Sequence, residues 1–114
     1  MLFLPENEWH EISLLFYNFM LRDKGFSTVY LGQSVPYDAL ISCVEQLAPR
    51  TMVTAWLTAV DDNFMQCYFK RLRNECTKIP VLAGGVQVNN RKDLVKDFIH
   101  EISDLPKQVE ALIS

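Results

Sequence analysis

His10 is one of the two histidines of this chain, and its imidazole can ligate a metal or move a proton near neutral pH. A single histidine in an acidic loop is usually only a solvated side chain. The surrounding sequence must therefore show whether His10 has a function. Three short segments stand at fixed intervals: Glu8-Trp9-His10-Glu11-Ile12-Ser13, Ala55-Trp56-Leu57 and Gly84-Gly85. The first and second are separated by 41 residues, and the second and third by 26.

The elements that must position these segments alternate between short apolar runs and helical patterns, which is typical of βαβ units and a parallel sheet. The apolar runs predict five strands, near residues 1–4, 28–31, 52–56, 80–83 and 98–102. Helical spacing predicts helices over 11–24, from about 36 to 48, from 61 or 62 to 76, and over 105–112, with a loop or short helix start at 89–93.

Each of the first three helices carries an apolar stripe that we expect to face the core. The stripes are Ile12, Leu15, Phe16 and Phe19; Leu40, Val44 and Leu47; and Met65, Tyr68, Phe69, Leu72 and Cys76. Gly25 is expected to follow the first helix as its C′ residue, and Asp61 or Asp62 to cap the third.

Ligands of open parallel sheets bind outside the carboxyl ends of the strands, near the switch point of the strand order. Four segments follow predicted strands and should meet there: His10, Gln33-Ser34, Trp56-Leu57-Thr58 and Gly84-Gly85. The sequence therefore predicts an α/β domain with helices on both faces of a five-stranded parallel sheet, and a binding site at one edge of that sheet.

These segments and their intervals resemble the cobalamin-binding fingerprint Asp-x-His-x-x-Gly, Ser-x-Leu, Gly-Gly. Four positions match it and three depart from it: His10, Leu57, Gly84 and Gly85 match, whereas Glu8 replaces Asp, Ser13 replaces Gly and Ala55 replaces Ser. With Tyr30-Leu31-Gly32-Gln33-Ser34-Val35-Pro36, the chain looks most like the C-terminal sensor domain of MerR-type transcriptional regulators. The resemblance implies a three-layer, flavodoxin-like (Rossmann-like) fold.

The resemblance also implies a set of functional residues. His10 would be the lower axial ligand of cobalt, with Glu8 holding its other ring nitrogen. The cofactor-binding set would be Glu8, Trp9, Glu11, Ile12, Ser13, Ala55, Trp56, Leu57, Gly84 and Gly85. The cofactor would be adenosylcobalamin or methylcobalamin, and its nucleotide tail would lie along the core beside the two glycines. Two departures weaken this expectation: Ser13 would cost about 1–3 kcal/mol if its φ were positive, and Ala55 lacks the hydroxyl of the fingerprint serine.

Length and composition restrict the class of protein. The chain has 114 residues, 49% of them hydrophobic, which suits one domain with a single core, 1–114. We expect it to be a segment of a longer regulator whose DNA-binding domain is absent here. A net charge of −3 gives no basic field for nucleic acid, so DNA would be bound only through that other domain.

The remaining features concern surroundings and partners. Cys43, Cys67 and Cys76 are widely spaced and form no Cys-x-x-Cys pair, so we expect free thiols in a cytoplasmic protein. No apolar run is long enough to span a bilayer, and no membrane partner is expected. A small-molecule corrinoid is the expected partner, with a homo-oligomer as an open alternative.

Several functions compete for this fold, and the main interpretation is a ligand-sensing regulatory domain that is not an enzyme. The enzyme-class alternative is the cobalamin carrier module of a corrinoid methyltransferase or mutase. A degenerate domain kept only for protein association is a third reading, based on Ser13 and Ala55. A phosphoacceptor receiver is disfavoured because Ala55-Trp56-Leu57 offers no Asp, and a flavin carrier because Glu6, Glu8 and Glu11 would repel a phosphate.

Overall fold

A computed structural model of the chain describes residues 1–113. Five parallel strands form one sheet: β1 (Leu2–Pro5), β2 (Tyr30–Val35), β3 (Met52–Ala55), β4 (Val81–Gly84) and β5 (His100–Glu101). Six helices accompany them: α1 (Ile12–Asp23), α2 (Tyr37–Leu47), α3 (Asp62–Glu75), α4 (Val86–Asn89), α5 (Lys92–Val95) and α6 (Leu105–Ile113). The fold predicted from the sequence is therefore confirmed.

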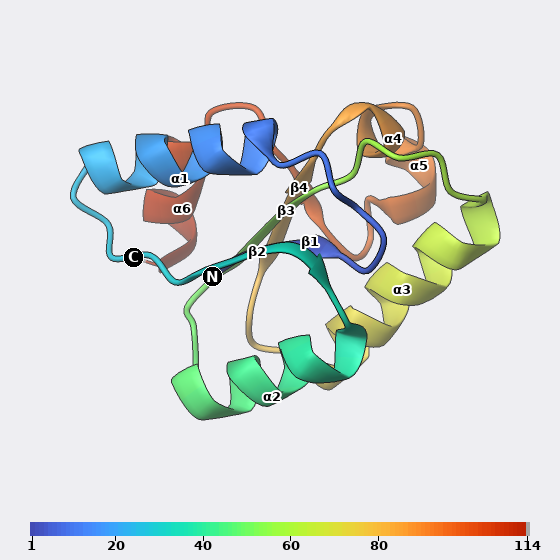
Figure 1. Cartoon of the computed structure of the whole chain (residues 1–114), viewed down its shortest axis with the longest axis horizontal. Coiled ribbons are helices and arrows are strands. Elements are labelled where there is room, and N and C mark those ends of the chain that lie inside the picture. The colour runs from blue at the N-terminus through green and yellow to red at the C-terminus, as the bar shows by residue number, and fades with distance from the viewer. Residues whose placement is uncertain (114) are drawn as a thin grey trace.

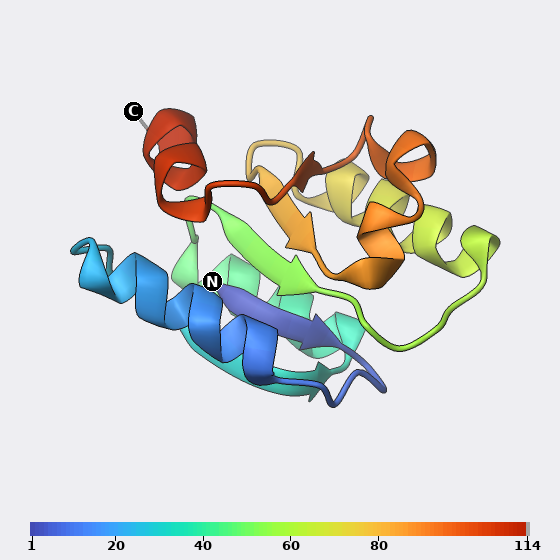
Figure 2. The ribbon, with the colours of Figure 1, turned by 90° about the horizontal axis from the view of Figure 1, so that it is seen from above.

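The strand order is β2-β1-β3-β4-β5, and every neighbouring pair is parallel. Helices α1 and α6 lie on one side of the sheet, and α2 and α3 lie on the other (Figure 1). Seen from above, the strand arrows point in one direction (Figure 2). The chain leaves β1 toward β2 and then crosses back to β3, so the switch point lies between β1 and β3, where a ligand is expected.

Two apolar layers hold the sheet between its helices. The layer under α2 and α3 includes Phe3, Leu40, Met52, Trp56, Met65, Phe69, Leu72 and Ala83. The layer under α1 and α6 includes Leu2, Leu4, Leu14, Leu21, Val53, Ala55, Leu82, Leu105 and Val109. Successive strand residues belong to opposite layers, as the period of a β-strand requires, and this sets which helix each site residue faces.

Helix α1 faces the sheet with the side opposite to the one predicted. Its buried residues are Leu14 and Leu21, whereas the expected core stripe of Ile12, Leu15, Phe16 and Phe19 is exposed. Ile12 is 84% exposed and Phe19 is 64% exposed. The cause is that α1 is apolar on both sides, so its apolar spacing does not identify the inner face.

The ends of the helices agree with the local signals in the sequence. Gly25 has a φ of 91°, and the N–H of Phe26 behind it donates to the carbonyl of Leu21 at 3.0 Å, which closes α1 with a Schellman motif. Asp61 caps α3 by accepting from the N–H of Phe64 at 2.7 Å.

Other expectations need correction. Leu47 of α2 is 52% exposed and is not a core residue. Gln33 and Ser34 lie inside β2 and not after it, because that strand extends to Val35. The last strand has only His100 and Glu101, and the segment after Gly85 forms the two short helices α4 and α5.

Candidate functional site

The segments singled out in the sequence meet at the carboxyl edge of the sheet. Ala55 and Gly84 end adjacent strands and are direct register partners in the β3–β4 pair. His10 lies in the loop that leaves β1, and the side chain of Glu8 in the same loop accepts a hydrogen bond from the N–H of Leu57, just past β3. The predicted convergence of His10, Ala55 and Gly84 on one edge is what the structure shows.

Glu8 holds this edge together. Its Oε1 atom accepts hydrogen bonds from the backbone N–H groups of Leu57 (2.5 Å) and Thr58 (2.6 Å), and its Oε2 atom accepts from the Thr58 hydroxyl (2.8 Å). The Glu8 carbonyl also accepts from the N–H of Ser34 in β2 (3.0 Å). A single residue therefore connects the loop after β1 to the strands on both sides of it.

The carboxyl group of Glu8 is ionised over most of the pH range. The residue is only 3% exposed, and burial alone would raise its pKa. The hydrogen bonds from Thr58, His10 and Leu57 outweigh burial and lower the pKa to about 2, from an ordinary value of 4.5. The site therefore contains a buried, fixed negative charge directly beside His10.

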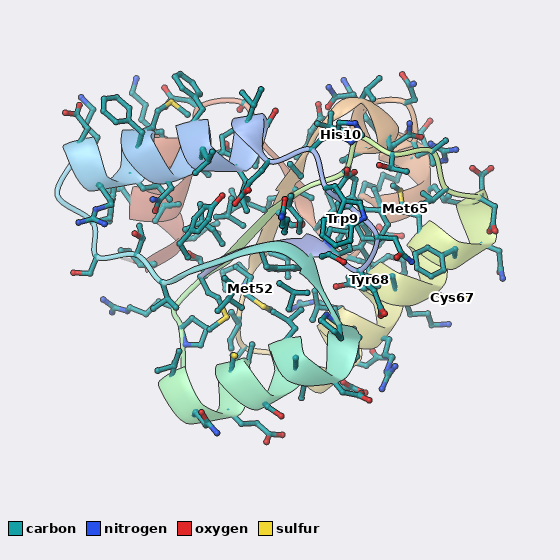
Figure 3. All side chains as sticks on the ribbon, in the orientation of Figure 1. Trp9, His10, Met52, Met65, Cys67 and Tyr68 are labelled. Atoms are coloured by element: carbon teal, nitrogen blue, oxygen red, sulfur yellow. The ribbon has the colours of Figure 1, made fainter. Side chains whose placement is uncertain are left out.

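His10 is oriented by that charge. Its Nδ1 atom lies 2.9 Å from Glu8 Oε2 and 3.3 Å from the Thr58 hydroxyl oxygen. Its side chain is 68% exposed, and among residues 1–113 its Nε2 atom has no protein partner. With Nδ1 occupied by the carboxylate, Nε2 is the ring nitrogen that is free to ligate a metal. Figure 3 shows His10 and its neighbour Trp9 on the loop after β1.

Gly85 permits the close packing of the loops after β3 and β4. Its φ is 95°, and a Cβ atom there would lie 2.5 Å from the carbonyl oxygen of Trp56. The backbone N–H of Trp56 donates to Gly84 (2.9 Å), and the N–H of Gln87 donates back to Trp56 (3.1 Å). No residue with a side chain fits at position 85 without moving this backbone.

Arg91 fixes the same two loops from outside. Its guanidinium donates to the carbonyl of Val60 (2.8 Å), to Asp62 Oδ1 (2.6 Å) and to Gln87 Oε1 (2.6 Å). The amide of Gln87 in turn donates to the carbonyl of Leu57 (3.1 Å). Because this planar group binds several acceptors at once, it sets the spacing between the loop after β3 and the helices after β4.

Gly84 leaves a space that Tyr17 of α1 fills. A methyl group at Gly84 would overlap the Tyr17 hydroxyl, and it would lie 3.4 Å from Ile102 Cδ1. Ala55, the register partner of Gly84, is fully buried in the same layer under α1. The expected course of the nucleotide tail, beside these two residues, is occupied by an aromatic ring of the protein.

The other predicted site residues lie at different depths. Trp9 and Ile12 are exposed at the rim, and Ser13 is half-buried in the first turn of α1. The positive-φ residues of the described chain do not include Ser13, so the backbone strain considered for it is absent. Glu11 precedes α1 and accepts from the Tyr30 hydroxyl at 2.7 Å.

Trp56 faces away from α1, on the other side of the sheet. It is 1% exposed and packs on α3, with ring centroids 5.0 Å from those of Tyr68 and Phe69. Strand alternation predicts this orientation, because Ala55 and Leu57 take the opposite side of the strand. Trp56 therefore contributes its backbone to the edge and its ring to the core.

The sequence did not indicate Thr58, Tyr17, Gln87 and Arg91 as site residues. Thr58 was placed at the edge but given no role, and its position directly after Leu57 was the available signal. Tyr17 lies four residues after Ser13, on the side of α1 that was taken to be the outer one. The contacts of Gln87 and Arg91 depend on tertiary geometry and have no signal in the sequence.

The described residues contain no cluster of three or more His, Cys, Asp or Glu side chains that could hold a metal ion. A metal at His10 would therefore need most of its ligands from another molecule. A cavity of about 350 Å³ opens beside this site, between the loop after β1 and the loop leading to α3, and Glu8, Trp56, Thr58 and Phe64 are among its lining residues. None of the helices within residues 1–113 is long and apolar enough to cross a membrane.

Comparison with known protein families finds no match. The chain is 30% identical over 117 aligned positions to the methanol–corrinoid protein of Methanosarcina barkeri, across 97% of this chain and 44% of that protein. It superposes on a chain in the crystal structure of the methanol:cobalamin methyltransferase complex MtaBC from Methanosarcina barkeri with a TM-score of 0.81, at 26% identity over 98% of this chain and 45% of that one.

A cobalamin-binding protein from Desulfitobacterium hafniense DCB-2 shares the fold, with a TM-score of 0.76 at 19% identity over 96% of this chain and 55% of that one. The chain spans less than half the length of the two Methanosarcina barkeri chains. These likenesses confirm the general resemblance to corrinoid- and cobalamin-binding proteins. The expectation of a regulatory domain that is not part of an enzyme is overturned, because the structural relative with the higher TM-score belongs to a methanol:cobalamin methyltransferase complex, which is an enzyme system.

Proposed function

We propose that the chain is a corrinoid-binding module of a methyl-transfer system, with cobalamin as its cofactor and His10 as the lower axial ligand of cobalt. The relatives support this reading, since one is a methanol–corrinoid protein and another belongs to a methanol:cobalamin methyltransferase complex. The corrinoid supplies the methyl-carrying chemistry when bound. The chain itself holds and orients the cofactor.

The observation that carries the proposal is the pairing of Glu8 with His10. The 2.9 Å contact of Glu8 Oε2 with Nδ1 leaves Nε2 as the exposed ring nitrogen. The ionised carboxylate favours the tautomer in which Nε2 has a free lone pair. It also makes the ring a stronger electron-pair donor to a metal. Because no other potential ligand cluster surrounds His10 among the described residues, the arrangement suits a metal held in a macrocycle.

The nucleotide tail of cobalamin fits this chain less readily than cobalt fits at His10. Gly85 keeps the loops after β3 and β4 close together, and its neighbour Gly84 has no side chain toward α1. The space over Gly84 is nevertheless filled by Tyr17, and Ala55 offers no hydroxyl beside it. The residues therefore fit cobalamin with a displaced nucleotide tail once the Tyr17 ring has moved.

The likeness to a chain of a methyltransferase complex supports a methyltransferase subunit as the partner. That subunit would present the methyl donor above the carboxyl edge of the sheet. The regulator reading, with DNA bound through a domain absent from this chain, is not favoured by the contacts described above or by the relatives named. The enzyme-class alternative of the sequence analysis therefore replaces the main one.

Retention of hydroxocobalamin after desalting, followed by its visible spectrum, tests the proposal. The wild type and His100→Ala should retain the cofactor with one and the same spectrum, because His100 is exposed on the edge strand β5, which is separated from β1 and the loop of His10 by β4 and β3. His10→Ala should retain less and show a spectrum without histidine ligation. Equal retention and identical spectra for His10→Ala and the wild type would contradict the role of His10.

A further inference from the structure

We infer that Tyr17 is a displaceable plug: it closes the slot between α1 and the sheet, over Ala55 and Gly84, and must swing out before the nucleotide tail of a corrinoid can enter. This inference rests on the proposed function, because that tail is the group that would occupy the slot. Tyr17 thereby becomes a residue that controls entry of the tail into the slot, a role that neither the relatives nor the sequence indicated.

Tyr17 occupies the space over Gly84. The Tyr17 hydroxyl lies where the Cβ of any other residue at position 84 would be, and the ring carbon that bears it is 3.4 Å from the same point. Ile102 borders this point at 3.4 Å, and Ala55 adds only a methyl group to the wall. The slot is therefore built from small residues on the sheet and is closed from α1 by one side chain.

Polar atoms of α1 next to the slot lack hydrogen-bond partners. The layer under α1 is made mostly of aliphatic side chains, and the Tyr17 hydroxyl lies against it over Gly84, without a hydrogen-bond partner within residues 1–113. The Oδ1 atom of Asn18, the next residue of α1, is buried without a partner. A buried oxygen without a partner is unfavourable, and the polar nucleotide tail carries donors that would satisfy it.

The Tyr17 side chain can rotate out of the slot. Tyr17 is half-buried, so part of this residue already reaches solvent. Rotation about χ1 between staggered positions carries a ring away from a surface without moving the helix backbone. The closed state thus exchanges with an open one, and only the open state accepts the tail.

The apparent affinity for a ligand falls by the fraction of protein that is competent to bind it. If the open state has a population of about 1–10%, removing the plug should raise the apparent affinity roughly 10–100-fold. Tyr17→Phe keeps the ring but removes the unpaired hydroxyl, and it should bind at a rate between those of the wild type and Tyr17→Ala. Phe16→Ala is the matched control, because it removes an aromatic ring from the exposed side of the same helix.

The experiment mixes each protein with hydroxocobalamin in a stopped-flow spectrometer and follows the visible spectrum. The wild type and Phe16→Ala should bind slowly, at a rate that is proportional to cobalamin concentration but lowered by the open fraction, because rotation of a side chain is much faster than binding. Tyr17→Ala should bind at least about tenfold faster at each concentration. Equal rates for all the proteins would overturn the plug while leaving corrinoid binding intact. If no protein bound, Tyr17→Ala included, although all were folded, the proposed function and the plug would both fail.

A ligand-free measurement tests the geometry independently. The φ of Gly84 lies outside the left-handed region, so Tyr17 is the main obstacle to a side chain there. Gly84→Ala should lower the melting temperature in the wild type and have a much smaller effect in the Tyr17→Ala background. An equal loss in both backgrounds would show that Tyr17 does not fill the slot and would overturn the inference.

Discussion

The carboxylate of Glu8 accepts hydrogen bonds from both the backbone N–H and the hydroxyl of Thr58, at 2.6 and 2.8 Å. These two residues are 50 positions apart in the sequence, and their contact joins the loop after β1 to the loop after β3. The same carboxylate orients the ring of His10. The proposed cobalt ligand and the fold at this edge therefore depend on one buried charge.

Glu8→Gln should destabilise the protein by about 1–3 kcal/mol, because an amide presents N–H groups where the backbone N–H groups of Leu57 and Thr58 need an acceptor. Urea unfolding followed by circular dichroism measures the change. The exposed Glu6, two residues earlier, supplies the control, and Glu6→Gln should stay within about 0.5 kcal/mol of the wild type. Equal stability for the two variants would show that the carboxylate of Glu8 is not a structural tie.

The contribution of Glu8 to stability should depend on pH in a defined direction. Its pKa is about 2 in the folded protein against an ordinary value of 4.5, so the folded state binds this proton less tightly. The stabilisation is therefore complete above about pH 5 and disappears as the pH falls toward 2, amounting to about 1–3 kcal/mol after allowance for solvent screening. The difference in unfolding free energy between the wild type and Glu8→Gln should shrink over that range, and a constant difference would refute this assignment.

Gly85→Ala should be more damaging than Gly25→Ala. Both positions have a positive φ, of 95° and 91°, but a Cβ at Gly25 would have nothing within 4 Å, whereas one at Gly85 would meet the backbone of Trp56. We expect a loss of about 1 kcal/mol at Gly25, from the conformation alone, and of at least about 2 kcal/mol more at Gly85. Chemical denaturation of both variants provides the comparison, and similar losses would mean that the approach of Trp56 is not tight.

The orientation of α1 predicts opposite results for two apolar residues. Leu14 is fully buried and Phe19 is 64% exposed. Leu14→Ala should cost about 2–4 kcal/mol in unfolding free energy, and Phe19→Ala less than about 0.5 kcal/mol, because only the first leaves a cavity. The reverse order would restore the orientation expected from the sequence.

The parallel sheet and the meeting of three segments at its edge could be predicted because both follow from chain order. Apolar runs alternate with helical patterns, and strands that point the same way bring their exits to one edge. The intervals between His10, Ala55 and Gly84 then suffice to place these residues near one another. That part of the site needs no side-chain geometry.

The inner side of α1 could not be predicted because the helix is apolar on both sides, and the choice between Leu14 and Phe16 depends on what the sheet offers. The roles of Thr58 and Tyr17 were missed for a related reason. Their contacts join segments distant in sequence, and no pattern of types or spacing along the chain specifies which atoms meet.

Electron paramagnetic resonance of the cobalt(II) form, in protein labelled with ¹⁵N at histidine, tests the central claim most directly. A nitrogen bound to cobalt splits the signal according to its nuclear spin, so the label separates a protein ligand from the cofactor's own base. We expect doublet splitting in labelled wild type and in His100→Ala, and its loss in His10→Ala. A triplet that is unchanged by the label would contradict the account, since it would show that cobalt keeps the nucleotide base and that His10 is not its ligand.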